Sequence, residues 1–374
     1  MKLLIFIHSL SVGGAERVAA QMATRWVQDG ADVVLVTTAS LLEDGYALDP
    51  RVHRIALDAA RNSGSLWDAM KNNLDRLRLL RRILRDERPD VALAVMSTSS
   101  VQLAIAGWGL TLVRIGSEHR QPDRASLGRS WNFLCRHSYR LLDAVVALTP
   151  EGADWIMRHT SARRVPVIPN SVSLPLRDEA PAISPDSVGS NACKRLLAVG
   201  RLTPVKGFTT LLAAYAKIAF QHEDWELVIV GTGPDRAMLE QRIAQLGLQG
   251  RVWLPGRVGN MADWYRSAHL FVSASLHEAF PMALLEAMAH GLPTVAFDCE
   301  AGPRNIIRHG VDGLLAPPGN SVALAENLAR LMANDEMRIF LGSHAIEVTS
   351  RFSEENIHAM WQRLFQELIH ARNT

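Results

Sequence analysis

Short hydrophobic runs alternate with longer stretches of helical periodicity along most of the chain. In its first part the short runs are rich in β-branched and apolar residues and predict β-strands. These runs are residues 2–7, 31–37, 51–57, 90–96, 111–117, 143–149 and 165–168. Helical patterns fill most of the intervals; the one over residues 15–28 stops just before Gly30, as a helix-ending glycine predicts. Regular alternation of helices with almost wholly apolar strands favours a parallel sheet covered on both faces.

The pattern breaks between residues 171 and 193, where Pro175, Pro181, Pro185 and Gly189 fall among Ser, Asp and Asn residues. This composition is typical of an interdomain linker. The alternation then resumes with a second set of predicted strands, at residues 195–200, 226–230, 252–254, 270–273, 294–297 and 313–316. Helical segments follow from about residue 320 to 371. We therefore predict an α/β protein with two doubly wound, Rossmann-like domains, the first over residues 1–170 and the second from residue 194.

Composition agrees with this organisation. A chain of 374 residues exceeds one ordinary hydrophobic core, and 48% hydrophobic with 21% charged residues argues against disorder. Its three cysteines, Cys135, Cys193 and Cys299, are far apart and form neither a disulfide framework nor a zinc motif. The apolar start is interrupted by His8, which favours a first strand over a leader peptide. We expect a soluble, cytoplasmic protein that binds no nucleic acid.

Two cations follow the first strand of the second domain. Arg201 and Lys206 stand between Gly200 and Gly207, at a strand end where parallel sheets bind their ligands. Most such cations are only solvated surface residues. Their position between glycines predicts a phosphate clamp instead.

Two carboxylates lie eight positions apart in the segment Glu278 to Glu286. Pro281 opens a helix between them, and a helix N-terminus favours anions. Glu286 could simply complement the helix dipole. However, the neighbouring side chains are mostly apolar, so buried carboxylates need hydrogen-bond donors, which sugar and ribose hydroxyls supply. Cations and carboxylates together predict a site for a nucleotide sugar.

Two features of the first domain are candidates for the same cleft. Gly13 and Gly14 follow the first strand and open a helix, where backbone can approach an anion closely, although a plain turn would look the same. His119 follows another strand; a lone histidine is more often structural, but a strand end faces the ligand-binding edge.

The segment from residue 71 to 88 is densely basic. At helical spacing Lys71, Arg78, Arg81, Arg82 and Arg85 share one face. The adjacent stripe of the helix is apolar and consists of Met70, Leu77, Leu80 and Leu84. A solvated polar face would also fit, but a basic amphipathic helix suits anionic lipid headgroups or a lipid-linked pyrophosphate. Residues 1–180 also carry 23 Lys and Arg against 19 Asp and Glu.

No motif with metal-ligand spacing is found. The sequence contains no Asp-x-Asp and no His/Cys cluster. We therefore expect protein cations to neutralise the diphosphate, with no metal and no cofactor beyond the nucleotide-sugar co-substrate.

Taken in order, these motifs resemble the retaining glycosyltransferases of family four (group 1). The resemblance covers nearly the whole chain and rests on residues 13–17, 200–207, 230–234, 254–256, 278–286, 302–307 and 310–315. Where that family more often has glutamate, this chain has Asn305. The resemblance implies the GT-B fold, two Rossmann-like domains facing a cleft. It also implies a second domain ending near residue 350 and a last helix, residues 351–374, that packs back on the first domain.

The resemblance also implies residue roles. Arg201 and Lys206 would bind the donor diphosphate, Glu278 the transferred sugar and Glu286 the ribose. Backbone near Gly256 and Arg257 would meet the base, and His119 would touch the donor sugar and face the acceptor. The implied catalytic set is Glu278, Arg201, Lys206 and His119. The remaining donor contacts are Gly13, Gly14, Ala279, Phe280, Pro281 and Met282.

The nearest resemblance within the family is to bacterial enzymes that extend undecaprenyl-diphosphate-linked oligosaccharides. It implies a retaining hexosyltransferase that uses a UDP-sugar, with a hexose or N-acetylhexosamine such as N-acetylgalactosamine. The product would belong to surface polysaccharide, O-antigen or glycoprotein glycan assembly. Lys71, Arg78, Arg82 and Arg85 would bind the lipid-linked acceptor in peripheral contact with the inner face of the plasma membrane. Alternatives on the same scaffold are a nucleotide-sugar epimerase, a glycan phosphorylase and an inactive nucleotide-sugar-binding subunit.

Overall fold

The computed structural model describes residues 1–373 apart from residues 12, 61–65, 120–127 and 191. The chain divides into two units: Met1–Asn170 with His358–Thr374, and Ser171–Ile357. The first boundary falls where the proline-rich segment begins. Residues 171–193, which we interpreted as a linker, group with the second unit, except Asn191, which lies outside the described residues.

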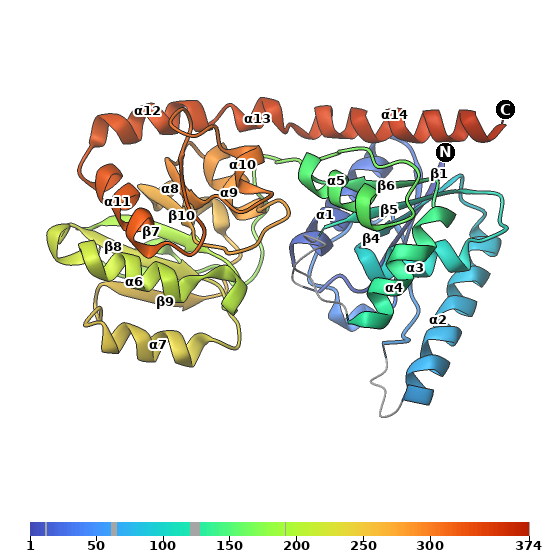
Figure 1. Cartoon of the computed structure of the whole chain (residues 1–374), viewed down its shortest axis with the longest axis horizontal. Coiled ribbons are helices and arrows are strands. Elements are labelled where there is room, and N and C mark those ends of the chain that lie inside the picture. The colour runs from blue at the N-terminus through green and yellow to red at the C-terminus, as the bar shows by residue number, and fades with distance from the viewer. Residues whose placement is uncertain (12, 61–65, 120–127, 191, 374) are drawn as a thin grey trace. The chain divides into compact units, whose positions relative to one another are not determined.

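The first unit contains a six-stranded parallel sheet in the order β3-β2-β1-β4-β5-β6 (Figure 1). Its strands are β1 (Lys2–Ile7), β2 (Asp32–Thr37), β3 (His53–Ala56), β4 (Val91–Val95), β5 (Val113–Glu118) and β6 (Ala144–Ala147). From β1 the chain builds outward to β3 and then returns to β4 on the other side. Strand order therefore reverses between β1 and β4, the position where doubly wound sheets bind ligands.

Helices cover this sheet because its strands bury side chains on both faces; every residue of β4 is buried. The helices of the unit are α1 (Gly14–Gln28), α2 (Leu66–Glu87), α3 (Ser97–Ala106), α4 (Arg129–Ser138), α5 (Pro150–His159) and most of α14 (Glu354–Asn373). Two short 3-10 turns, η1 (Leu41–Glu43) and η2 (Tyr139–Leu141), complete it.

The last helix completes the first unit through an aromatic cluster. Trp26 of α1 is 2% exposed, and its ring lies 5.2 Å from that of Phe365 and 6.2 Å from that of Trp361, both in α14. His358, also in α14, pairs with Asp29 at the end of α1, at 2.8 Å. These contacts pack α14 against α1 within the first unit.

The second unit contains a second six-stranded parallel sheet, in the order β12-β11-β10-β7-β8-β9. Its strands are β7 (Lys194–Val199), β8 (Trp225–Val230), β9 (Val252–Gly256), β10 (Leu270–Ser273), β11 (Thr294–Phe297) and β12 (Leu314–Ala316). The connectivity repeats that of the first unit. Strand order here reverses between β7 and β10.

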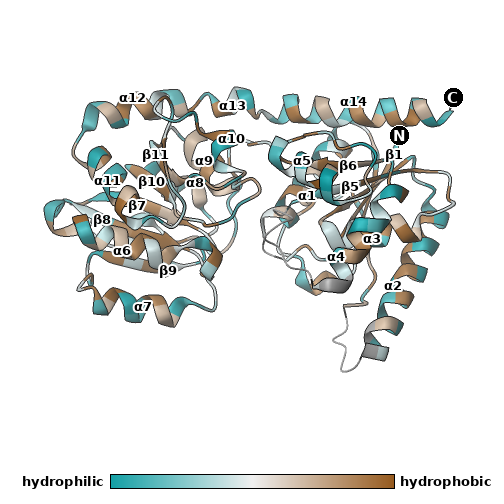
Figure 2. Cartoon of the chain, in the orientation of Figure 1, coloured by the Kyte–Doolittle hydropathy of each residue, from teal (hydrophilic) through white to brown (hydrophobic). Residues whose placement is uncertain are grey.

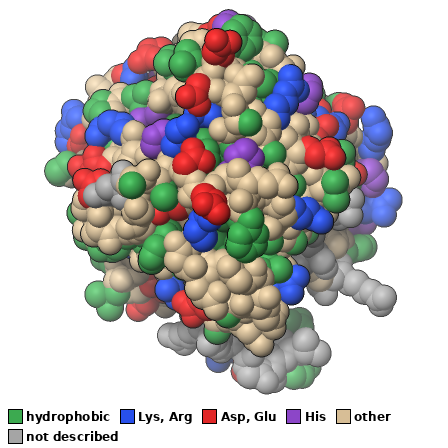
Figure 3. All heavy atoms as spheres, turned by 90° about the vertical axis from the view of Figure 1, so that its left-hand side faces the viewer, with side chains coloured by type: hydrophobic (Ala, Val, Ile, Leu, Met, Phe, Trp, Pro, Cys, Tyr) green, Lys and Arg blue, Asp and Glu red, His purple; other side chains and the backbone are tan. Residues whose placement is uncertain are grey.

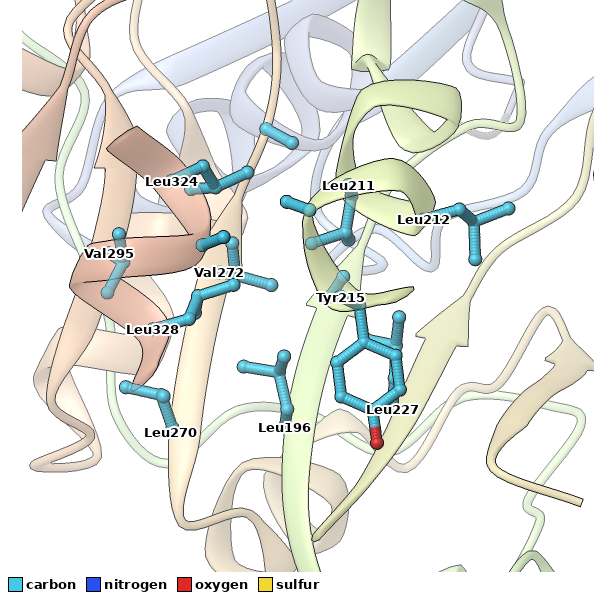
Figure 4. Packing of buried hydrophobic residues seen from close by; sticks show 14 of the residues in the cluster. Leu196, Leu211, Leu212, Tyr215, Leu227, Leu270, Val272, Val295, Leu324 and Leu328 are labelled. Carbon is cyan, nitrogen blue, oxygen red and sulfur yellow. The ribbon is translucent and has the colours of Figure 1, made fainter. Parts of the chain in front are cut away.

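The helices of the second unit pack on its sheet through a continuous hydrophobic core. Leu211 and Tyr215 of α6 and Leu328 of α11 meet Leu196 of β7 (Figure 4). The Tyr215 hydroxyl, which the core would otherwise leave unpaired, donates to the Trp225 carbonyl at 2.9 Å. The helices are α6 (Phe208–Ile218), α7 (Arg236–Gln245), α8 (Met261–Ser267), α9 (Met282–Ala289), α10 (Pro303–Ile306), α11 (Ser321–Met332), α12 (Asp335–Ala345) and α13 (Val348–Arg351), with 3-10 turns η3 (Pro185–Ser187), η4 (Pro204–Lys206) and η5 (Ala219–Gln221).

Hydropathy follows this layering. Apolar residues concentrate in the strands and on the helix faces against them, while polar residues occupy the outward faces (Figure 2). On the face drawn in Figure 3, acidic and basic side chains of the described residues are interspersed.

One predicted strand is wrong. Residues 165–168 form no strand; Val167 makes only an isolated parallel bridge to Ala147. Pro166 and Pro169 lack the N–H groups that a ladder needs, so the segment follows the sheet edge without joining it. The other predicted strands match β1 to β12 within two residues at each end.

Backbone approaches closely at the end of β7. Gly207 has φ +64°, and a Cβ there would lie 2.0 Å from the Ala274 carbonyl oxygen. Gly231, after β8, would place a Cβ 1.9 Å from the Gly200 carbonyl oxygen. Only glycine fits at either position, so three neighbouring loops are held against one another.

Trp26→Ala should lower the free energy of unfolding of the first unit by about 3–5 kcal/mol, because it leaves a cavity between α1 and α14. Urea denaturation followed by circular dichroism measures this loss. The matched control is Trp67→Ala in α2, where the side chain is 80% exposed. Equal stabilities of the two variants would contradict the packing described.

Gly207→Ala should lower the melting temperature clearly more than Gly247→Ala. Both glycines have positive φ, so both variants carry the same type of backbone strain, but a Cβ at Gly247 meets nothing within 4 Å. The difference between them isolates the clash with Ala274. Equal melting temperatures, measured by calorimetry, would show that the loop accommodates the added methyl group without loss of stability.

Candidate active site

A lysine and a glutamate from separate loops meet at the carboxyl edge of the second sheet. Lys206 ends the 3-10 turn after β7, and Glu278 lies in the loop after β10. These strands are neighbours in the sheet, and their loops are joined by a hydrogen bond from the Leu276 amide to the Val205 carbonyl, at 2.8 Å. Both residues thus stand where strand order reverses, the expected ligand position of a doubly wound sheet.

The Lys206 ammonium forms an ion pair with the Glu278 carboxylate. The Lys206 side chain is 26% exposed and that of Glu278 15% exposed, so both charges are largely removed from water but still reachable. Burial, together with the Glu278 charge, raises the pKa of the Cys299 thiol to about 12. The arrangement offers a cation and an acceptor side by side.

Arg201 lies on the same loop, directly after β7 and Gly200, and its side chain is exposed. Gly200 lets the loop pack closely, because a Cβ there would lie 3.3 Å from Cδ of Lys206. The structure therefore places both predicted phosphate-binding cations on one loop, and Lys206 pairs with Glu278.

The segment after Glu278 leads directly into α9. Pro281 is the N-cap residue and makes no side-chain capping bond, so the first amides of the helix remain available to a ligand. Phe280 is 6% exposed and packs on Phe352 with ring centroids 5.4 Å apart. Ala279 and Met282 are half-buried. A Cβ on Gly302 would lie 2.9 Å from the Glu278 carbonyl oxygen, so backbone from the next loop fixes this segment.

Glu286 lies in the interior of α9 and is 2% exposed. Its Oε2 accepts a hydrogen bond from the Tyr265 hydroxyl at 3.0 Å, which supplies one of the partners that a buried carboxylate needs. Tyr265, in α8, was not singled out from the sequence. Its partner is 21 positions away, and no local pattern indicates such a pairing.

Gly256 is the last residue of β9, and Arg257 follows it. The Gly256 carbonyl accepts from the Gly231 amide at 2.8 Å, and a Cβ on Gly256 would meet nothing within 4 Å. Arg257 pairs with Glu179 of the proline-rich segment at 3.2 Å. The backbone here is open to a ligand while the arginine side chain is held by the segment before β7.

In the first unit, the Gly13–Gly14 loop is held by a tyrosine. The Tyr46 hydroxyl donates to the Gly13 carbonyl at 2.9 Å and accepts from the Gly13 amide at 3.1 Å. A Cβ on Gly14 would meet nothing within 4 Å, so this residue faces open space. Sequence reasoning missed Tyr46, which is 33 positions from Gly13.

His119 directly follows β5, and its Nε2 lies 3.0 Å from the Ser117 hydroxyl oxygen. Burial lowers the pKa of His119 to about 4. Because a lowered pKa means that the imidazolium loses its proton at a lower pH, His119 is neutral at physiological pH. It can exchange hydrogen bonds with a ligand but adds no positive charge.

A buried carboxylate next to His119 was not expected from the sequence. Glu118 is 4% exposed and accepts a hydrogen bond from Ser97 at 2.6 Å and another from Tyr139. Burial and the Glu118 charge raise the pKa of Tyr139 well above its ordinary value and that of Cys135 to about 11. Glu118 therefore fixes the orientation of Ser97, at the start of α3.

Ser97 lines a cavity of about 260 Å³ in the first unit. The cavity lies where strand order reverses, between His8 after β1 and residues 96–98 after β4. Its other walls are Arg76 of α2, Gln102 of α3 and Trp131 of α4. No sequence motif marked these residues; the only signal was their position after β1 and β4.

The basic segment forms helix α2, but one of the predicted surface cations lies elsewhere. Lys71, Arg78, Arg82 and Arg85 are exposed, as expected for a surface cation row. Arg81 is not part of that row, because its guanidinium donates to the carbonyls of Ala106 and Trp108 at the end of α3 (2.7 and 2.8 Å). A long side chain near unpaired helix-end carbonyls caps them readily.

The apolar stripe beside the cations is only partly buried. Leu80 and Leu84 are buried, but Met70 is 65% exposed, with Trp67 at 80% and Leu74 at 47%. These three side chains recur at helical spacing in the first turns of α2. Further along the helix, Leu80 and Leu84 pack in the hydrophobic core of the first unit. The helix thus presents both an apolar stripe and a cation row to solvent.

The described residues contain no group of three or more His, Cys, Asp or Glu residues arranged to hold a metal ion. Among their helices, none combines the length and the apolarity that crossing a membrane requires.

Two family models match the chain in succession. Residues 12–175 match the model described as Glycosyltransferase Family 4, and residues 193–334 match that described as Glycosyl transferases group 1. Together they span both units and include every predicted donor-binding residue.

Curated relatives carry related descriptions. An amylovoran biosynthesis glycosyltransferase of Erwinia amylovora is 28% identical over 96% of this chain and 98% of its own length. A Campylobacter jejuni alpha-1,4-N-acetyl-D-galactosaminyltransferase, named for an undecaprenol-diphosphate-linked GalNAc oligosaccharide, is 27% identical over 99% of this chain and 100% of its own. An exopolysaccharide phosphotransferase of Streptomyces coelicolor is 33% identical over 82% of this chain, which spans only 31% of that protein.

Solved structures show the same fold. Sucrose-phosphate synthase from Thermosynechococcus elongatus matches with a TM-score of 0.84 at 21% identity, covering 99% of this chain and 100% of that one. Anabaena HepE in complex with UDP and glucose matches with a TM-score of 0.79 at 21% identity, covering 98% and 100%. With its two parallel six-stranded sheets and these two consecutive family models, the chain belongs to the group 1, family 4 glycosyltransferases of the GT-B fold.

Proposed function

We propose that this protein is a retaining, metal-independent hexosyltransferase that moves a hexose or N-acetylhexosamine from a UDP-sugar to a lipid-linked glycan acceptor. The observation that carries the proposal is the contact of Lys206 with Glu278 at the strand-order reversal of the second sheet. One of these groups suits the phosphate that leaves, and the other suits the hydroxyls of the sugar that is transferred.

Negative charge on the leaving diphosphate is the main electrostatic demand of the reaction. As the anomeric bond breaks, its electron pair passes to the β-phosphate oxygen. Lys206 would stabilise that charge, with Arg201 from the same loop and the first amides of α9 beside it. In this proposal these groups take the role that a metal ion has in other transferases.

Retention of configuration needs bond breaking and bond making on one face of the sugar. The acceptor oxygen would attack the anomeric carbon on the face from which UDP departs. Its proton would pass to the departing phosphate oxygen, so no separate protein base is needed. Glu278, partly buried beside Lys206, would hold the sugar hydroxyls as positive charge develops on the ring.

The nucleotide would lie along the ends of β7 to β9. Glu286, positioned by Tyr265, would bind the ribose hydroxyls, and the open backbone at Gly256 would meet the base. A UDP complex of the similarly folded HepE supports uridine as the base. In the first unit, neutral His119 would exchange hydrogen bonds with a sugar, and the open backbone at Gly14 would leave room for a ligand.

The lipid-linked acceptor is supported by α2 and by the relatives. The C. jejuni relative is named for an undecaprenol-diphosphate-linked substrate, and the E. amylovora relative for the biosynthesis of amylovoran. Exposed Lys71, Arg78, Arg82 and Arg85 would bind the acceptor pyrophosphate, and the exposed apolar stripe at Trp67, Met70 and Leu74 would rest in the lipid interface. We therefore place the enzyme at the cytoplasmic face of the plasma membrane, in polysaccharide or lipid-linked glycan assembly.

Lys206→Met should reduce turnover at saturating UDP-sugar by about 10²- to 10³-fold, because one donor to the developing charge is lost. Radiolabelled UDP-sugars identify both the donor and the product, and transfer of label to an acceptor separates a transferase from an epimerase.

The control is Lys217→Met, an exposed lysine of α6, which should leave turnover unchanged. Near-normal turnover of Lys206→Met would remove its role. No turnover of any UDP-sugar by the unaltered protein would reject the donor class itself.

Replacing Arg78, Arg82 and Arg85 together by Gln should reduce transfer to an undecaprenyl-diphosphate-linked acceptor by at least about 10-fold more than slow hydrolysis of the donor. Each exposed cation near an anionic lipid surface contributes about 1 kcal/mol. The two rates are measured in the same vesicle suspension.

A triple variant of equal charge change, at exposed Arg158, Arg330 and Arg363, serves as the control. If both triple variants lose transfer to the same degree, α2 has no specific part in acceptor binding.

A further inference from the structure

The segment before β7 that we interpreted as a linker is fastened to the loop after β9. The Glu179 amide donates to the Gly259 carbonyl at 3.2 Å, and the Gly259 amide donates to the Pro181 carbonyl at 2.7 Å. A Cβ on Gly259 would lie 1.9 Å from the Glu179 carbonyl oxygen, so the two backbones are in direct contact. Residues 179–183 therefore belong to the structure around the end of β9.

Side chains fasten the same segment a second time. The Asn260 side-chain amide accepts from the Ile183 amide at 3.0 Å and donates to the Ile183 carbonyl at 3.1 Å. The indole N–H of Trp264, in α8, donates to that carbonyl as well, at 3.0 Å. Asn260 and Trp264 are buried, so water does not compete for these bonds. They hold the segment in place whether or not the Glu179 side chain is present.

The Glu179 side chain has a different partner. Its carboxylate accepts a hydrogen bond from the Arg257 guanidinium at 3.2 Å, and the two side chains are 34% and 36% exposed. Water and salt screen an ion pair at that exposure, so the pair adds little to the stability of the fold. Its effect is to restrict the arginine: a long side chain with many rotamers is held in one place, and its charge is partly neutralised.

Arg257 stands where a bound nucleoside would extend. It follows Gly256, the last residue of β9, and β9 is two strands from β7 in the sheet. Because neighbouring strands are about 4.8 Å apart, the end of β9 lies about 10 Å from the end of β7, which leads into the loop that carries Lys206. A nucleoside diphosphate is long enough to cover this distance, so phosphates at Lys206 would place the base beside Arg257.

We propose that Glu179 is a positioning residue of the donor site, which holds the Arg257 guanidinium at the face of the nucleoside base. A planar guanidinium stacks on aromatic faces, and one that is already restrained loses little rotamer freedom when the base binds. Pairing with a carboxylate also weakens the attraction of Arg257 for the diphosphate, which leaves that group to Lys206 and Arg201. The inference rests on the proposed function in placing the diphosphate at Lys206.

The test separates binding of the base from binding of the phosphates. Isothermal titration calorimetry of the full chain measures the affinities of UDP, CDP, ADP, GDP and inorganic pyrophosphate. Glu179→Gln should weaken the tightest-binding nucleotide about 2- to 5-fold, as expected for the loss of one cation–π contact, and should not weaken pyrophosphate. General damage to the fold would weaken both ligands.

Arg257→Lys, which keeps the charge but removes the planar group, should cause the same loss of nucleotide affinity. Because Glu179 acts through Arg257, the combined variant Glu179→Gln/Arg257→Lys should lose no more than either single variant. The matched control is Glu347→Gln, which breaks the Arg308–Glu347 ion pair of the second unit, at 2.8 Å, and should leave both affinities unchanged.

An unchanged nucleotide affinity in Glu179→Gln would overturn the inference. So would equal weakening of nucleotide and pyrophosphate, or additive losses in the combined variant. Each of these results leaves the proposed function standing as long as the unaltered protein transfers label from a UDP-sugar. Failure of the unaltered protein to bind any of the four nucleotides would overturn both.

Discussion

The ion pair between Lys206 and Glu278 is the constraint on which the rest of the second unit depends. It joins loops from β7 and β10, the two strands between which the chain changes direction. Opposite charges can remain so shielded from water only because each satisfies the other. A ligand that enters must therefore offer replacements for both: an anion for the ammonium group and hydroxyl donors for the carboxylate. A nucleotide sugar carries both within one molecule.

The two units place their polar side chains at the same position in the fold but use different residues. Both sheets have the same strand connectivity, and each unit gathers its polar side chains at the position where strand order reverses. In the second unit these side chains are the paired Lys206 and Glu278. In the first unit Ser97, Gln102 and Arg76 line one cavity, and the buried Glu118 accepts a hydrogen bond from Ser97.

Much of the fold was predictable because strands and helices are local patterns. Residues 2–7 coincide with β1, and only the proline-flanked run at 165–168 fails. The loops that carry Lys206 and Glu278 were found because glycine and proline spacing marks strand ends. Tyr46, Tyr265 and Gln102 could not be found, since what places them is packing against residues far away in the sequence. The exposure of Met70 and the capping role of Arg81 were missed for a related reason: periodicity gives the faces of a helix but not which neighbour covers each face.

The position of α14 has a consequence for how the protein is made. Because His358, Trp361 and Phe365 of α14 pack around Trp26, the first unit lacks these contacts until α14 has left the ribosome. The second unit, Ser171–Ile357, is synthesised before the part of α14 that contacts Trp26, so its own residues are complete first. The nascent first unit therefore has the Trp26 surface uncovered during this interval, and transiently exposed apolar surface favours aggregation and chaperone binding.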